Sequence, residues 1–207
     1  MKINSLLLLL LLIFLLSGCG DKLSTNTKDE SANITTASLT GTWTAKCSDN
    51  TTASTSSRTA LVFSASADNL TATTTNYSDL SCGTQSFIFT KKLNTLVLGS
   101  KTSTSQNQII SQFTAVIADI TLEPKTSTVS TSLNSSSFCG LTSWSSGTAT
   151  SVAGLTCGST VNKALNAAYS DIIQMNSEKT FIRLGNITNP ASTTGYPKTL
   201  YATDYFK

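Results

Sequence analysis

The five cysteines are the residues of this chain whose type and spacing point most directly to chemistry. Cys19 stands alone near the N-terminus, and the other four lie in the body of the sequence: Cys47, Cys82, Cys139 and Cys157. An even number of cysteines in an exported protein favours disulfide bonds. A thiolate metal site is the less favoured alternative, because the chain has no C-x-x-C spacing. We therefore predict two disulfides and neither a metal nor another cofactor, with free thiols as the remaining alternative.

The chain contains no histidine. This excludes Ser-His-Asp and Cys-His catalysis, imidazole zinc sites and histidine-ligated haem. No serine lies in a nucleophile-elbow motif, and no glycine-rich phosphate loop is present. The acidic residues that we considered as catalytic acids are scattered, and each fits a turn or a solvent-facing position: Asp79, Asp119, Glu123, Asp171 and Asp204. We predict that the protein is not an enzyme.

Positive charge is spread thinly along the chain. The formal net charge is +3, and Lys91-Lys92 is the only basic doublet after the N-terminal apolar run. Nucleic-acid binding needs a clustered basic surface, so we predict that no nucleic acid is bound. The doublet is interpreted as the solvated end of a strand.

The first residues have the pattern of a signal peptide. Lys2 supplies a positive charge, and an apolar run of leucines with one Ile and one Phe follows over residues 6–16. As a helix this run rises about 16 Å, against roughly 30 Å of bilayer hydrocarbon, so it is too short to span a membrane. The pattern predicts export of the remaining chain.

Leu16-Ser17-Gly18-Cys19 resembles the lipobox of bacterial lipoproteins. The resemblance implies that residues 1–18 are a cleaved lipoprotein signal peptide and that Cys19 carries the lipids that anchor the protein to a membrane. It also implies a cell-envelope location. Gly20 favours the outer membrane over the inner one, because lipoproteins kept at the inner membrane commonly have Asp at this position. The alternative is an ordinary secretory signal with a cysteine near its cleavage point.

The body of the chain separates into a polar segment and a β-rich domain. Residues 19–37 are polar and poor in large apolar groups, which predicts a flexible tether. Over residues 38–207 short apolar stretches alternate with Ser, Thr, Asn and Gly clusters, which predicts an all-β domain. The predicted strands are 39–47, 60–66, 70–78, 85–91, 95–99, 108–122, 164–176, 180–184 and 199–206.

Short connections between these strands favour an antiparallel up-and-down meander. About eight or nine strands with one apolar face close most economically into a barrel, with a flat sandwich as the alternative. Residues 132–161 interrupt the rhythm and are predicted to form a structured loop or short helix packed on the barrel. In the meander Cys47 and Cys82 lie at the same end of the sheet, and Cys139 and Cys157 bracket the loop. This favours the pairs Cys47–Cys82 and Cys139–Cys157 among the possible pairings.

Gly41 and Trp43, in the first predicted strand, resemble the Gly-x-Trp motif of lipocalins. The resemblance implies an eight-stranded lipocalin-like barrel in which Trp43 closes one end and the other end admits a small hydrophobic ligand. It further implies a basic residue over the tryptophan, contributed from the end of the last strand, for which Arg183 and Lys207 are the candidates.

The sequence thus gives two hypotheses for function. In the first, a lipid-anchored barrel binds or carries a small apolar ligand. In the second, a barrel filled with side chains has a structural or interaction role at the cell envelope, with a protein partner that the sequence does not name.

Overall fold

The computed structural model describes residues 33–186 and 195–207. The predicted signal peptide, Cys19 and most of the predicted tether lie outside these residues. Within them no helix is both long and apolar enough to cross a membrane.

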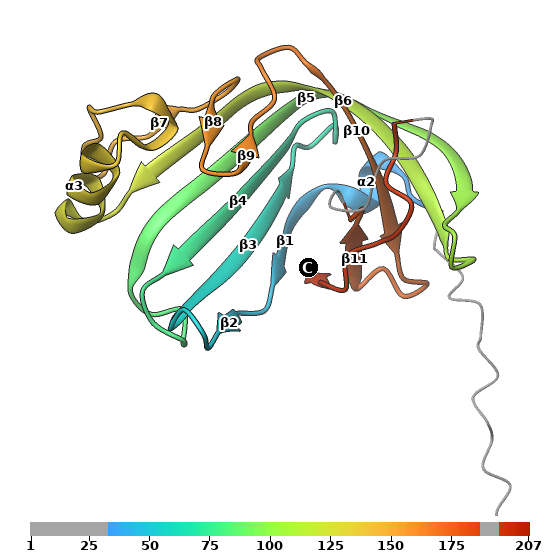
Figure 1. The fold of residues 1–207 in the computed structure, drawn as a ribbon. Coiled ribbons are helices and arrows are strands. Elements are labelled where there is room, and N and C mark those ends of the chain that lie inside the picture. Colours follow the sequence, from blue (N-terminus) through green and yellow to red (C-terminus); the bar gives the residue numbers. More distant parts are fainter. Residues whose placement is uncertain (1–32, 187–194) are drawn as a thin grey trace, which may run out of the picture.

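Antiparallel strands build the fold, and eight of them pair in a ring (Figure 1). The two ends of this strand order meet at β1, which pairs with β12 on one side and with β3 on the other. In chain order its strands are β1 (Gly41–Ala45), β3 (Thr55–Phe63), β4 (Leu70–Tyr77), β5 (Gln85–Ser103), β6 (Ile109–Pro124), β10 (Ala168–Met175), β11 (Phe181–Leu184) and β12 (Tyr205–Phe206). Neighbours in the ring are neighbours in the chain, so the predicted all-β, up-and-down meander is confirmed.

The strands form where apolar and polar residues alternate. In β1, Trp43 and Ala45 are buried whereas Thr42 is exposed, so one face of the strand meets the core and the other meets water. The short strand β2 (Ser48–Asn50) extends the sheet at the edge of β3. The core side of the ring is packed with large apolar side chains, including Trp43, Phe113 and Ile173.

The longest strand, β5, joins two strands that the sequence predicted separately, 85–91 and 95–99. Its pairing with β6 shifts register at three places, after Lys92, after Asn94 and after Leu98. Such bulges bend a strand without ending it, so the polar residues around Thr95 mark a bend rather than a turn. In Figure 1 β5 and β6 accordingly run as two long curved strands.

The predicted last strand is shorter than expected. Only Tyr205 and Phe206 of the predicted strand 199–206 form β12, and a single bridge joins Leu200 to Gly185.

The fold begins before the predicted domain boundary. A short helix, α2 (Thr36–Leu39), follows Thr35, whose hydroxyl accepts a hydrogen bond from the Ser38 N–H in a capping box. Ile34 and Leu39 are buried, at 9% and 0% exposure. These two apolar side chains and the cap order residues that the polar composition had assigned to the tether, so its predicted end at residue 37 is too late.

The segment between β6 and β10 carries the predicted helix and loop, although the helix begins earlier than residue 132. It contains α3 (Ser127–Ser135), a single 3-10 turn at Phe138–Gly140, β7 (Thr150–Ser151), and a hairpin of β8 (Thr156–Cys157) and β9 (Thr160–Val161). Thr126 caps α3 by accepting from the Val129 N–H. Trp144 is 4% exposed, and Asn134 of α3 bonds its backbone N–H and C=O.

Candidate functional site

A cavity of about 410 Å³ lies against β5, β6 and β10 and is bordered by the β8–β9 hairpin. This volume falls in the range of roughly 300–1,000 Å³ that small-molecule sites occupy. The walls are mostly apolar, with two lysines among them. The lining side chains include Phe89, Lys91, Ile117, Ile120, Lys163 and Tyr169.

These wall residues lie on the core face of the sheet. Phe89, Lys91 and Leu93 are every second residue of β5, so their side chains lie on the same face of the strand, and Leu93 is buried in the core. Ile117 and Ile120 of β6 belong to the core as well, and Tyr169 packs against it. The cavity is therefore a part of the inner side of the ring that side chains do not fill.

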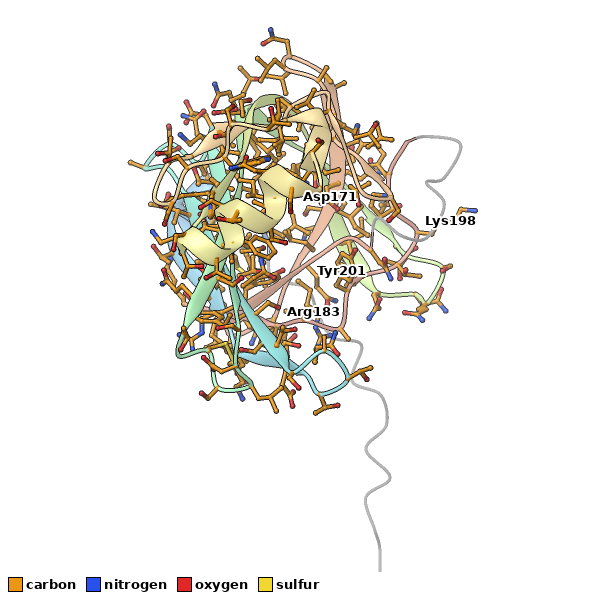
Figure 2. All side chains as sticks on the ribbon, turned by 60° about the vertical axis from the view of Figure 1, so that its left-hand side comes forward. Asp171, Arg183, Lys198 and Tyr201 are labelled. Atoms are coloured by element: carbon orange, nitrogen blue, oxygen red, sulfur yellow. A yellow bond between two sulfur atoms is a disulfide. The ribbon has the colours of Figure 1, made fainter. Side chains whose placement is uncertain are left out.

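Asp171 is a buried carboxylate beside this cavity. It is 1% exposed and accepts three hydrogen bonds: from the Tyr169 hydroxyl at 2.7 Å, the Ile172 N–H at 2.8 Å and the Gly185 N–H at 3.1 Å. Gly185 has to be glycine here, because a Cβ would lie 2.2 Å from the carboxylate oxygen. Asp171 lies on β10, and Figure 2 labels it together with Tyr201. The backbone N–H of Tyr201 donates to the Leu184 C=O of β11.

Burial is the largest influence on the pKa values of Asp171 and Tyr169. It raises the pKa of Asp171 to about 6, while the hydrogen bonds and the charge of Lys91 act in the opposite direction. Burial and the neighbouring Asp171 carboxylate raise the pKa of Tyr169 well above its ordinary value. At neutral pH the tyrosine is therefore a hydrogen-bond donor and the aspartate is mostly ionised.

Two ammonium groups face the ring of Tyr169 from different elements. The Lys91 Nζ on β5 lies 5.1 Å from the ring centroid, and the Lys163 Nζ, beyond β9, lies 5.8 Å from it. Lys163 also donates to the Ala168 C=O at 2.7 Å. Burial lowers the pKa of Lys91, the carboxylate of Asp171 raises it, and the charge of Lys163 lowers it further.

Two of these residues lie elsewhere than the sequence predicts. The prediction of a solvated strand end is wrong for Lys91, which is half-buried in the cavity wall, whereas Lys92 is exposed. The prediction of a turn or solvent-facing position is wrong for Asp171, which is buried within β10. The signal that was available is the alternation Phe87, Phe89, Lys91, Leu93, which places Lys91 on an apolar face.

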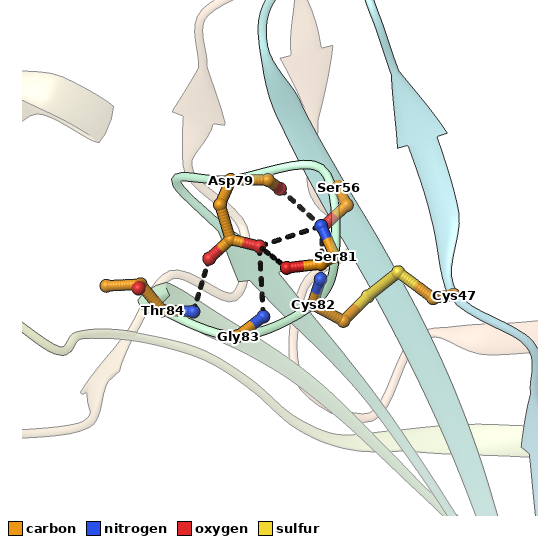
Figure 3. The surroundings of a disulfide bond; sticks show 7 residues. All are labelled: Cys47, Ser56, Asp79, Ser81, Cys82, Gly83 and Thr84. Carbon is orange, nitrogen blue, oxygen red and sulfur yellow. Dashed lines mark hydrogen bonds between the residues drawn. A yellow bond between two sulfur atoms is a disulfide. The ribbon is translucent and has the colours of Figure 1, made fainter.

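The structure contains both disulfides that the sequence favoured, Cys47–Cys82 and Cys139–Cys157, with Cα–Cα distances of 6.1 and 4.2 Å. Figure 3 shows the first, next to a tight turn around Asp79. The Asp79 carboxylate accepts hydrogen bonds from the backbone N–H groups of Ser81, Gly83 and Thr84, which hold its pKa well below the usual range. These contacts fix the loop that carries Cys82, so the site is structural.

Trp43 is 0% exposed and donates from Nε1 to the Leu39 C=O at 2.7 Å. Of the two candidate basic residues, Lys207 covers it, with Nζ 5.0 Å from the ring centroid. Arg183 instead forms an ion pair with Asp204. Gly41 has a φ of +111°, which favours glycine, and a Cβ there would lie 3.4 Å from Lys207 Cε.

Neither a protein-family model nor a curated protein matches this chain. The resemblances to bacterial lipoproteins and to lipocalins therefore stay predictions.

Proposed function

We propose that this protein is a lipid-anchored component of the bacterial cell envelope whose barrel binds or carries a small hydrophobic ligand without catalysis. The observation that carries the proposal is the apolar cavity of about 410 Å³ on the core face of the ring. A filled interior would favour the structural or interaction role instead, because it would leave no room for a ligand.

The wall gives a ligand apolar surface on more than one side. Phe89 comes from β5, Ile117 and Ile120 come from β6, and Tyr169 comes from β10. Burial of an apolar molecule against such walls is favourable in proportion to the area removed from water. Trp43 and Tyr205 are packed in the core elsewhere in the ring. The packed core supports the strands that carry the cavity wall.

The anchoring part of the proposal rests on the Leu16–Cys19 motif. Two or more acyl chains give stable membrane attachment at about 0.8 kcal/mol for each buried CH₂ group. Residues 19–32 then separate the lipid from the β-rich domain.

Binding of N-phenyl-1-naphthylamine, an uncharged fluorescent apolar probe, to the purified domain tests the proposal. We expect saturable binding, and mass spectrometry of molecules extracted from the purified protein should show a retained apolar compound. Phe89→Ala should weaken probe binding by about tenfold, because it removes apolar wall surface.

Phe87→Ala is the matched control. Phe87 lies on the same strand and also packs against the core, but it does not line the cavity. Its truncation should leave probe affinity unchanged. An absence of saturable binding, together with an empty extract and specific capture of an envelope protein, would favour the structural role.

A further inference from the structure

Two lysines interrupt the mostly apolar wall of the cavity. Lys91 is half-buried in the wall of β5, and Lys163 stands at the exposed rim beyond β9. Their ammonium groups face the same aromatic ring, that of Tyr169, at 5.1 and 5.8 Å. Two positive charges from elements far apart in the sequence therefore lie near one aromatic ring of the cavity wall, close enough for each to affect the other.

Both oxygens of the nearby Asp171 carboxylate already accept hydrogen bonds from within the protein. One of its oxygens accepts from the Tyr169 hydroxyl, and the other accepts from the N–H groups of Ile172 and Gly185. Among residues 33–186 and 195–207, the ion pairs within 4.0 Å are Lys125–Glu123 and Arg183–Asp204, so Lys91 has no carboxylate in direct contact. With Asp171 ionised, the two lysines leave this cluster with one positive charge more than it has negative charges.

We propose that the ligand of this cavity is an amphipathic molecule with an apolar body and a single anionic group, and that Lys91 and Lys163 bind this group. The inference rests on the proposed function and names the ligand class. Lys91 supplies a partly desolvated charge at the wall, and Lys163 supplies a second donor at the rim. The apolar body packs on Phe89, Ile117 and Ile120.

The physical advantage of an anion here follows from burial. Removing an ammonium group from water is unfavourable unless a counter-charge or hydrogen-bond acceptor replaces the water. The two lysines also repel each other, which contributes to the lowered pKa of Lys91. An anion placed near both would offset the burial of Lys91 and the repulsion, whereas an uncharged ligand would offset neither.

Two probes that differ only by a sulfonate group test the inference without changing the protein. 8-Anilino-1-naphthalenesulfonate carries one sulfonate, and N-phenyl-1-naphthylamine is the same aromatic body without it. A charge-assisted hydrogen bond in a desolvated site is worth about tenfold or more in affinity. We therefore expect the domain to bind the sulfonate probe at least about tenfold more tightly than the uncharged probe.

Substitutions then locate the charge. Lys91→Met keeps the length of the side chain and removes its charge, so it should weaken the sulfonate probe by about tenfold and leave the uncharged probe within about twofold. Lys163→Met should act in the same direction, and Lys91→Arg should retain binding of the sulfonate probe. Lys92→Met is the control, because Lys92 is exposed and does not line the cavity.

The outcomes separate the two claims. Saturable binding of both probes with equal affinity overturns the anionic ligand and leaves the proposed function standing. Equal losses for Lys91→Met and Lys92→Met also overturn it, because they indicate a general effect of surface charge. Binding of neither probe to the folded wild-type domain overturns the proposed function itself.

Discussion

At the scale of single residues, the distribution of buried charge is the main feature of this protein. Asp171 is ionisable and 1% exposed, and its environment combines a tyrosine hydroxyl with two backbone N–H groups. The groups that act on its pKa, or whose own pKa it changes, are Lys91 of β5, Tyr169 of β10 and Tyr205 of β12. A carboxylate placed in this way makes stability depend on pH.

Asp171→Asn should remove that dependence. The pKa of Asp171 is about 6 in the folded protein and 3.8 as the ordinary value, so the folded state binds more protons between these values. Its contribution to the free energy of unfolding therefore falls as pH rises through this window, by up to about 3 kcal/mol. The free energy of unfolding of Asp171→Asn minus that of wild type should therefore rise by up to about 3 kcal/mol between about pH 4 and pH 7. Urea unfolding at a series of pH values measures this difference.

The comparison with wild type isolates Asp171 between about pH 4 and pH 7, because the groups whose pKa it changes, Lys91, Tyr169 and Tyr205, have ordinary pKa values far above this range. Asn keeps the shape of Asp and an oxygen that accepts from the Ile172 and Gly185 N–H groups. A stability difference that stays constant across the pH range would show that burial does not raise this pKa.

At the scale of elements, alternation predicts the strands and hydrogen bonding sets their ends. The predicted strand 70–78 is close to the observed β4 (Leu70–Tyr77), a run rich in the β-branched residue Thr. The strands 85–91 and 95–99 are one strand in the structure, because bulges carry β5 past Asn94 and Thr95. Pairing partners, which local sequence does not specify, decide whether a polar pair ends a strand or bends it.

Each disulfide joins two segments that are not neighbouring strands of the sheet. Cys47 follows β1 and Cys82 lies between β4 and β5, at a sequence separation of 35. Cys139 and Cys157 join the 3-10 turn to β8 at a separation of 18. Each link restricts the unfolded chain, and the longer loop is restricted more.

Replacing both Cys47 and Cys82 with Ser should lower the free energy of unfolding by about 4 kcal/mol, and replacing both Cys139 and Cys157 should lower it by about 3 kcal/mol. Urea unfolding under non-reducing conditions measures both changes. The Asp79 turn and its hydrogen bonds remain in the first variant, so a loss well below about 1 kcal/mol would mean that the turn alone fixes this end of the sheet.

At the scale of the whole molecule, we propose that a lipid at the N-terminus holds the ring of strands to a membrane. Lys207 covers Trp43 at one place in the ring, and the cavity opens beside the β8–β9 hairpin at another. The apolar interior is thus divided between a packed core and a cavity.

Cys19→Ser should release the protein from the membrane fraction. Expressed with its own N-terminal sequence in a bacterium that processes lipoproteins, the wild type should partition into detergent, and its intact mass should include a diacylglyceryl group and a further acyl chain. The variant should carry neither, because serine has no thiol to modify. Cys47→Ser is the control and should remain lipidated, and equal partitioning of Cys19→Ser and wild type would contradict the anchor.

From the sequence alone, the all-β class and the meander could be predicted, and two disulfide pairs could be favoured over the other pairings. These follow from local patterns, namely alternation, short polar connections and the positions of four cysteines along the predicted strands. Composition also indicated a polar segment before the domain, although the cap at Thr35 and the burial of Ile34 place its end earlier than predicted.

The charged groups at the cavity are set by tertiary packing. Lys91 and Lys163 of the wall and the nearby Asp171 come from β5, from the segment after β9 and from β10, and local sequence does not predict that they lie close together. The curvature of β5 and β6 and the path of the β8–β9 segment bring them together. The choice of Lys207 over Arg183 as the cover of Trp43 was likewise set by packing, because it depends on where the short strand β12 pairs with β1.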